Sequence, residues 1–254
     1  RILSSAASDV YKRQFQNYKT PNFKIHLTRG ILNIPMMLLS FSALQFIPLE
    51  QIKAISFVTP IIVVILSVIF LKEKIYLIRI SALFIGLIGV FVILRPGFVS
   101  INVGAYMVLC ACLIWSVVVI ITKFAAKEDS AFTILSYQYT FVTILSFPIA
   151  LYFWDTPSSQ TIIYLIFAGI AGTIVHLCIN TAYKLTDLSV LQPVNFSRLL
   201  IASFFGFLIF DEIPDIWTII GGLIIFSSIL IITYRENYLK KDIAKKSIQL
   251  NLNS

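Results

Sequence analysis

Residues 191–212 read LQPVNFSRLLIASFFGFLIFDE, an apolar stretch in which Arg198 lies near the middle, after Pro193 and Asn195. A helix that spans a bilayer needs about 20 mostly apolar residues, and Leu188–Phe210 has that length. The solvent around this segment decides the fold. In water an arginine here needs no explanation, whereas in a membrane it needs a partner.

The composition of the whole chain is typical of a protein with many membrane-spanning segments. Of its 254 residues, 58% are hydrophobic and 13% are charged, whereas soluble domains have about 45–50% apolar and about 25% charged residues. The mean hydropathy is +0.91. The net charge of +8 comes from loops between apolar runs, so we predict a lipid bilayer, and no nucleic acid, as the partner of this charge.

The sequence predicts eight membrane-spanning helices. The runs are apolar all round and do not alternate, which favours helices over β-strands. Short linkers indicate hairpins packed in one bundle. The predicted spans are Gly30–Pro48, Ala54–Leu71, Ile78–Leu94, Val103–Ile121, Phe132–Trp154, Ile162–Tyr183, Leu188–Phe210 and Ile216–Tyr234.

Basic residues gather in alternate loops, which predicts the orientation. One set of loops and ends holds Lys19, Lys24, Arg29, Lys72, Lys74, Arg79, Lys123, Lys127, Lys184, Arg235, Lys240, Lys241, Lys245 and Lys246. The opposite loops hold Arg95, with Lys53 near a helix start, and the acids Asp155, Asp211, Glu212 and Asp215. By the positive-inside rule both termini face the cytoplasm, and the chain is a multi-pass protein of the inner (plasma) membrane.

The chain contains an internal repeat with a shift of 139 residues (180 − 41). Residues 41–73 read FSALQFIPLEQIKAISFVTPIIVVILSVIFLKE, and residues 180–212 read NTAYKLTDLSVLQPVNFSRLLIASFFGFLIFDE. The shift places Phe57 on Phe196 and Glu73 on Glu212. Because corresponding helices lie an odd number of spans apart, the copies have opposite orientations. Inverted repeats are typical of secondary transporters, which bind substrate near the bilayer midplane.

Two further stretches follow the repeat, GLIGVFVILRPG at 86–97 and IIGGLIIFSSILIITYRE at 219–236. On these residues the chain resembles the drug/metabolite transporter superfamily in its EamA branch, over Arg29 to Glu236. The resemblance implies an all-α inverted-repeat bundle of ten helices, of which eight are present here. Residues 15–99 would form a first repeat without its first two helices, and residues 100–236 a five-helix second repeat. Residues 237–254 would form a basic cytoplasmic tail.

Two shorter segments carry their own resemblances. Residues 1–14, RILSSAASDVYKRQ, resemble a translated sequencing adapter, and we interpret them as foreign to the protein. Residues 171–183, AGTIVHLCINTAY, are similar to a segment of carriers for riboflavin or S-adenosylmethionine.

Polar side chains inside spans are costly and usually face a cavity or another helix. His176 and Asn180 belong to a stripe with Thr173 and Tyr183, spaced 4, 3 and 3 along one helix face, which suits a ligand or close helix packing equally. His176 has no second ligand at metal spacing, so we predict no metal site. The candidate substrate-binding residues are Asn33, Trp115, Tyr137, His176, Asn180, Asn195 and Arg198.

Helix ends and breaks supply the other candidates. Pro60 and Pro193 each remove a backbone hydrogen bond in equivalent helices, which predicts a helix break or a plain kink. Glu73 and Glu212 end equivalent helices and are predicted to cap a helix or act in gating.

Arg198 has three candidate partners: a carbonyl loosened near Pro60 or Pro193, a carboxylate on an absent helix, or an anionic group on the substrate. Asn195, one turn earlier, would contact the same substrate. His26 precedes the first span, so we expect it at the membrane surface.

The absence of catalytic motifs favours transport over an enzyme. The sequence has no GxxxxGK[ST], HExxH or GxSxG motif, so no nucleotide-driven motor or hydrolase site is predicted, and no cofactor. We therefore expect a secondary transporter of a small, anionic organic metabolite, with import or export undecided. The alternative is a membrane-embedded enzyme or receptor. Assembly as a homodimer is left open.

Overall fold

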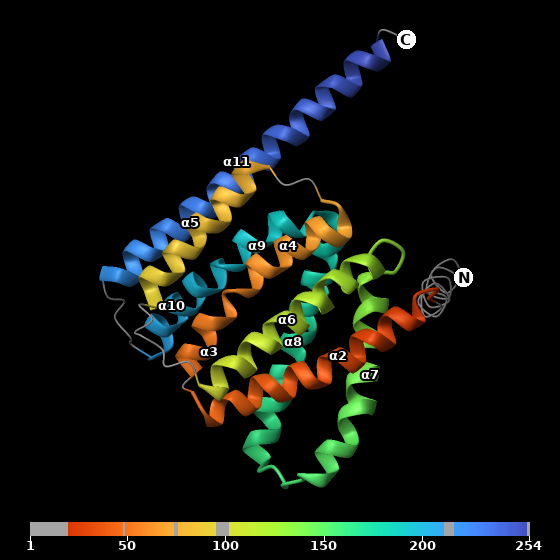
Figure 1. Cartoon of the computed structure of the whole chain (residues 1–254), viewed down its shortest axis with the longest axis vertical. Coiled ribbons are helices and arrows are strands. Elements are labelled where there is room, and N and C mark those ends of the chain that lie inside the picture. The colour runs from red at the N-terminus through yellow and green to blue at the C-terminus, as the bar shows by residue number, and fades with distance from the viewer. Residues whose placement is uncertain (1–19, 48, 74–75, 95–101, 211–215, 253–254) are drawn as a thin grey trace, which may run out of the picture. The chain divides into compact units, whose positions relative to one another are not determined.

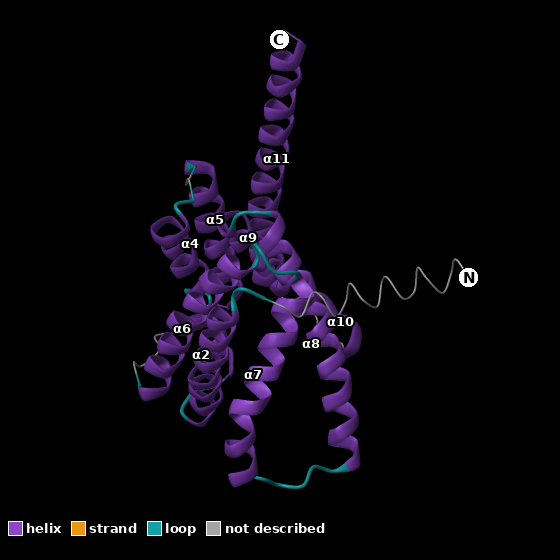
Figure 2. Ribbon diagram, turned by 90° about the vertical axis from the view of Figure 1, so that its right-hand side faces the viewer, coloured by secondary structure: helices purple, strands orange, loops and turns teal. Residues whose placement is uncertain are grey.

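The structure is a computed structural model that describes residues 20–47, 49–73, 76–94, 102–210 and 216–252. Within these ranges every regular element is a helix, as Figure 2 shows. The helices are α2 (Phe23–Ser42), a 3₁₀ turn (Ala43–Gln45), α3 (Leu49–Ser56), α4 (Thr59–Leu71), α5 (Leu77–Leu94), α6 (Val103–Ala125), α7 (Ala131–Tyr152), α8 (Ser159–Leu185), α9 (Leu188–Asn195), α10 (Ser197–Phe210) and α11 (Ile216–Leu252). The predicted all-α class is confirmed.

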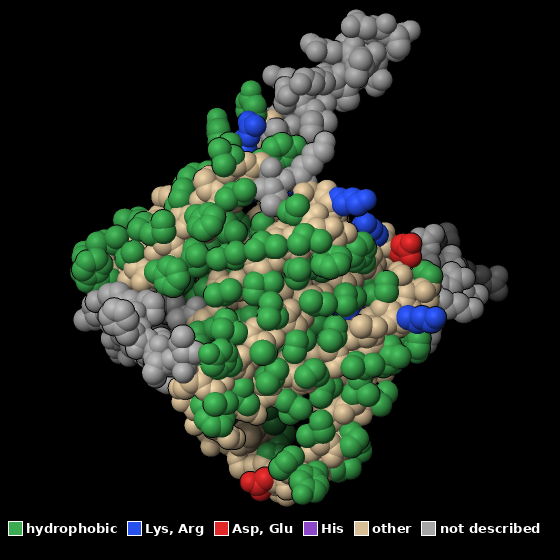
Figure 3. All heavy atoms as spheres, viewed as in Figure 1, with side chains coloured by type: hydrophobic (Ala, Val, Ile, Leu, Met, Phe, Trp, Pro, Cys, Tyr) green, Lys and Arg blue, Asp and Glu red, His purple; other side chains and the backbone are tan. Residues whose placement is uncertain are grey.

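Several helices have the length and composition of membrane spans. Among the described residues, five candidate spans are long and apolar enough, Phe23–Gln45, Val103–Ala125, Ala131–Tyr152, Ser159–Leu185 and Ile216–Arg235, and α4 and α5 are shorter apolar helices. Hydrophobic side chains cover most of the described surface on the face drawn in Figure 3. These features bear out the prediction of a polytopic membrane protein.

Two predicted spans are each divided into two helices. Ala54–Leu71 is interrupted between α3 and α4, and Leu188–Phe210 is interrupted between α9 and α10. Pro60 lies in the first turn of α4, where a missing N–H costs nothing. Pro193 lies inside α9, which ends two residues later. One proline therefore follows its interruption and the other precedes it.

Helix boundaries follow the shift of 139 residues found in the sequence. α3 and α9 coincide at both ends (188 − 49 and 195 − 56), and α5 and α11 begin at equivalent residues (216 − 77). The interruptions fall at Phe57 and Phe196, whose buried rings lie 5.8 Å apart between centroids. Each ring is thus the repeat counterpart of the ring that it contacts.

The chain divides into two compact units, with boundaries inside α6 and after the ends of α2 and α8. Unit 1 comprises residues 1–42 and 110–186, and unit 2 comprises residues 43–109 and 187–254. The buried core of unit 2 surrounds the two phenylalanine rings and consists of Phe57, Val64, Leu83, Leu87, Val90, Phe196 and Ile225.

In unit 2, α5 and α11 lie side by side (Figure 1) and touch at two equivalent points. A Cβ added to Gly89 would lie 2.8 Å from the Gly221 carbonyl oxygen, and one added to Gly221 would lie 2.6 Å from the Gly89 oxygen. At the second point the Ser228 hydroxyl donates to the Ala82 carbonyl oxygen over 2.6 Å. The shift of 139 exchanges the two contacts (82 with 221 and 89 with 228). A pseudo-two-fold therefore relates the two helices.

In unit 1, glycines at equivalent positions have different neighbours. Gly30 lets α2 approach α7, because an added Cβ would lie 2.5 Å from the Phe141 Cβ. Its counterpart on α8, Gly169, has no such neighbour within 4 Å. The apolar window of α8 buries none of its residues. Helix α8 thus has an open face where α2 is covered.

Candidate functional site

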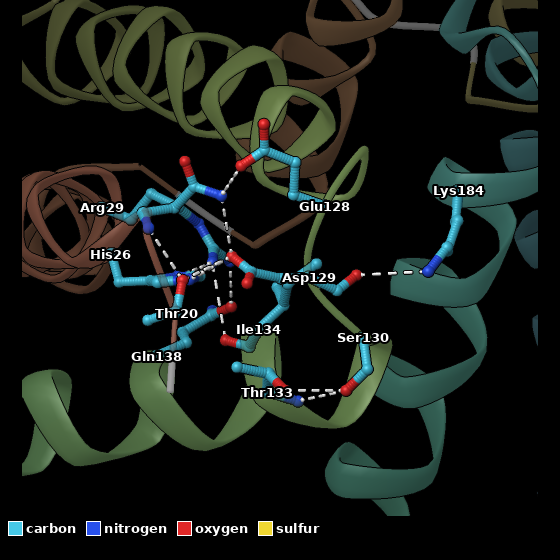
Figure 4. Close-up of polar contacts among 11 residues, drawn as sticks. Thr20, His26, Arg29, Glu128, Asp129, Ser130, Thr133, Ile134, Gln138 and Lys184 are labelled. Carbon is cyan, nitrogen blue, oxygen red and sulfur yellow. Dashed lines mark hydrogen bonds and ion pairs between the residues drawn. The ribbon is translucent and has the colours of Figure 1, made fainter. Parts of the chain in front are cut away.

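A buried polar cluster in unit 1 joins α2 to α7 and to the loop before α7 (Figure 4). We call His26, Arg29, Asp129 and Gln138 the Arg29 cluster. His26 Nε2 lies 2.9 Å from Asp129 Oδ2, and Arg29 Nη1 lies 3.3 Å from His26 Nδ1. Arg29 Nη2 donates to Gln138 Oε1 over 2.6 Å. Arg29 is 1% exposed and His26 is fully buried, so the cluster is sealed from its surroundings.

These contacts assign the protonation of the His26 ring. An arginine only donates hydrogen bonds, so Nδ1 of His26 accepts from Arg29. A neutral imidazole then carries its hydrogen on Nε2 and donates to Asp129. The ring therefore links the aspartate to the guanidinium, and two opposite buried charges balance through it. A buried charge without such compensation would be strongly destabilising.

Local sequence explains how the cluster forms. His26 and Arg29 are one turn apart on α2 and share a face. Asp129 precedes Ser130, the N-cap of α7, whose hydroxyl accepts from the Thr133 N–H at 3.0 Å. This cap fixes the loop that presents Asp129 to α2.

Aromatic rings lie against the cluster. The Tyr137 ring stacks on the His26 ring with centroids 4.9 Å apart and an angle of 9° between the planes. The Phe23 and Phe141 rings contact the Tyr137 ring at centroid distances of 6.2 and 6.0 Å. A predicted substrate residue, Tyr137, thus lies where aromatic faces meet buried polar groups.

The carboxyl end of α8 is held by lysines of unit 1. Lys123 Nζ donates to the carbonyl oxygens of Tyr183 and Thr186 at 2.5 and 2.6 Å. Lys184 Nζ lies 3.5 Å from the Asp129 carbonyl oxygen. Cations at the end of a helix satisfy its last carbonyls and favour its dipole. Lys123 therefore fixes the end of α8 that follows its polar stripe.

The polar stripe of α8 lies within electrostatic range of Arg29. The charge of Arg29 acts on the Tyr183 hydroxyl and on the His176 ring. Asn180 lies between them on the same face and is buried, and its Nδ2 has no hydrogen-bond partner. Nε of Arg29 also lacks one. Two buried donors on two helices are thus left without an acceptor.

The remaining unit 1 candidates make local contacts. Asn33 is buried and donates to the Arg29 carbonyl oxygen in its own helix at 2.8 Å. The His176 ring meets the Tyr139 ring edge-on at 6.1 Å. Trp115 is half-buried in α6. The expectation that His26 lies at the membrane surface is wrong, because Asp129 and Arg29 hold it inside unit 1.

In unit 2, Arg198 has an aromatic partner. Its guanidinium carbon lies 4.9 Å from the centroid of the Phe57 ring, which is a cation–π geometry. The sequence analysis considered a carbonyl, a carboxylate and the substrate, but no ring. Asn195 donates to Gln192 Oε1 over 3.2 Å in its own helix. Both Arg198 and Asn195 are exposed.

The beginning of α9 is also tied within unit 2. The Glu73 carboxylate accepts from the N–H groups of Leu188 and Ser189 at 2.9 and 3.2 Å, which places negative charge at a helix N-terminus. Arg79 donates to Asp187 Oδ2 at 2.9 Å and to the Ser189 hydroxyl at 3.0 Å. Glu212, the repeat counterpart of Glu73, lies outside the described residues, as do residues 1–14.

A comparison with known families matches the EamA-like transporter family over residues 2–95 and 102–234. The chain belongs to the EamA-like transporter family. It is 28% identical over 228 residues to the S-adenosylmethionine uptake transporter of Rickettsia prowazekii, covering 90% of this chain and 76% of that protein. It is 29% identical over 223 residues to the riboflavin transporter of Vibrio cholerae, covering 87% and 75%.

A solved structure titled "Crystal structure of protein" has the same fold, with a TM-score of 0.73 at 17% identity over 85% of this chain and 79% of that one. Together the family match and the named relatives confirm the prediction of a multi-pass membrane protein that transports small metabolites. The direction of transport stays undecided.

Proposed function

We propose that this EamA-family protein is a secondary transporter of a small metabolite that contains a nitrogen heteroaromatic ring system, and that it has no enzymatic activity. S-adenosylmethionine and riboflavin, named for two relatives, both combine such a ring with a hydroxylated chain or sugar. The observation that carries the proposal is the juxtaposition of the Tyr137 aromatic group with the buried donors of Arg29 and Asn180. Aromatic faces suit a flat heterocycle, and oriented donors suit its polar substituents.

We further propose that the protein lies in the inner (plasma) membrane with both termini in the cytoplasm. The alternation of basic loops supports this orientation. The ends tied by Lys123, Lys184 and Arg79 would then lie on the cytoplasmic side.

The open face of α8 supports a third part of the proposal. Two further helices of the first repeat would cover α8 as α7 covers α2, with Gly169 in the role of Gly30. The relatives named above are longer than the aligned segments, which agrees with additional helices in the family.

Accumulation in cells tests the proposed function. A bacterial strain without its own uptake systems for riboflavin and S-adenosylmethionine would express the protein and receive each labelled compound. We expect accumulation or enhanced efflux of at least one compound relative to vector-only cells. Membrane-localised protein that moves neither compound, nor any heteroaromatic metabolite in a competition panel, would refute the proposal.

A further inference from the structure

The guanidinium of Arg29 keeps one edge without acceptors. An arginine has five N–H groups, and those of Arg29 donate to His26 Nδ1, the Ile134 carbonyl oxygen and Gln138 Oε1. Nε makes no hydrogen bond, and Nη2 makes one of the two that it can make. Nε–H and the N–H of Nη2 beside it form the side-on fork with which arginine holds two oxygens of one carboxylate or phosphate.

The Asp129 carboxylate does not occupy this fork. It reaches the guanidinium only through the His26 ring, which contacts Nη1 on the other side of the group. The ion-pair network therefore stabilises the buried charge of Arg29 and leaves the fork for another acceptor.

Asn180 offers a further donor from α8. It lies four residues after His176 and three before Tyr183, and both of these interact with the charge of Arg29. Residues at these spacings share a helix face, so Asn180 lies on the face of α8 that Arg29 affects. Its Nδ2 is buried without a partner. Native proteins rarely leave buried donors unsatisfied without a functional reason.

We propose that Arg29 and Asn180 bind an oxyanion of the transported substrate, a carboxylate or a phosphate, between α2 and α8 in unit 1. The side-on fork of Arg29 takes two oxygens, and Asn180 Nδ2 donates to one of them. This inference rests on the proposed function, and it assigns to Arg29 the anion recognition that the sequence analysis gave to Arg198. Tyr137, stacked on His26, places an aromatic face near the bound group.

Substitutions of Asn180 separate binding from folding, because its unpartnered Nδ2 makes no contact that folding needs. Asn180→Leu removes the donor, and Asn180→Asp places a fixed carboxylate where the oxyanion would bind. Arg29→Lys keeps the charge but loses the fork. Thr181→Ala is the matched control, because Thr181 is the next residue of α8, is exposed, and bonds only to the Leu177 carbonyl oxygen of its own helix.

The experiment measures uptake into proteoliposomes and the melting temperature of each purified variant. Three probes distinguish the oxyanion: S-adenosylmethionine has a carboxylate, riboflavin 5′-phosphate has a phosphate, and riboflavin has neither. We expect the wild type and Thr181→Ala to prefer a probe with an oxyanion. For that probe Asn180→Leu should raise KM about 10-fold or more, the loss expected for a hydrogen bond to a charged group. Asn180→Asp should abolish uptake with an unchanged or higher melting temperature.

The outcomes separate this inference from the proposed function. If the wild type carries none of the three probes, the proposed function fails and the inference fails with it. If the wild type carries a probe and both Asn180 variants keep its KM, the oxyanion site is refuted while the transporter remains. A wild type that carries riboflavin better than both charged probes also refutes the oxyanion site.

Discussion

The contact between α5 and α11 makes a quantitative prediction about Gly89. In Gly89→Ala the new methyl group would lie 2.8 Å from the Gly221 carbonyl oxygen, 2.8 Å from Ile225 Cγ1 and 3.0 Å from the Ile225 nitrogen. Two of these three atoms belong to the backbone and cannot rotate away. The helices must therefore separate at the point where their glycines allow close approach.

The magnitude follows from two opposing effects. Adding a methyl group to a packed core costs about 1–3 kcal/mol, and alanine regains about 0.8–1.0 kcal/mol over glycine in a helix. Because the obstacles are backbone atoms, we expect a net loss of about 1–2 kcal/mol. Gly169→Ala, with nothing within 4 Å of the added carbon, should show only the gain, at most about 1 kcal/mol.

Thermal unfolding of the purified variants in one detergent measures the difference. A change of 1 kcal/mol shifts the melting temperature by about 2–4 °C for chains of this size, so Gly89→Ala should melt about 2–8 °C below the wild type. Gly221→Ala meets the same contact from the other helix, and the double variant should lose less than the sum of the two losses. If Gly89→Ala melts at the same temperature as Gly169→Ala, the close approach of α5 and α11 is refuted.

Three further substitutions test contacts at the helix ends and the orientation. Glu73→Gln should lower stability by about 0.3–1 kcal/mol in the same thermal assay, because it removes the charge at the start of α9; an unchanged melting temperature would contradict this capping role. Arg198→Gln should lower stability by about 0.5–1 kcal/mol through loss of the contact with Phe57, while the KM for the transported compound stays at the wild-type value; a raised KM would instead restore Arg198 as a substrate ligand. A single cysteine at Asp155, in a variant without other cysteines, should react with an impermeant maleimide in intact cells, and reaction only after permeabilisation would reverse the proposed orientation.

The helical class and the repeat could be predicted because both depend on patterns that extend over many residues. Hydropathy identifies apolar runs of span length, and the shift of 139 residues (188 − 49) matches the boundaries of α3 and α9. The division of two spans was harder to predict, because Phe57 and Phe196 at the interruptions are as apolar as their neighbours. Only the nearby prolines indicated it, and a proline predicts a disturbance without fixing the residue at which a helix ends.

The polar cluster was largely missed, because its partners lie far apart in sequence. His26 and Asp129 are separated by 103 positions, and neither residue has a local motif that indicates the other. Arg29 was counted among the loop charges, although its spacing from His26 indicates a shared helix face. Arg198 was noticed as an isolated charge, but the ring that contacts it belongs to the other repeat. Long-range pairing of this kind requires the fold.

Substrate counterflow in proteoliposomes tests the central claim most directly. Vesicles that contain the purified protein would be loaded with unlabelled S-adenosylmethionine or riboflavin and diluted into a trace of the same labelled compound. A transporter predicts transient accumulation of label above its external concentration, with at least one of the two compounds, and no accumulation in protein-free vesicles. Folded, helical protein that exchanges neither compound would contradict the account.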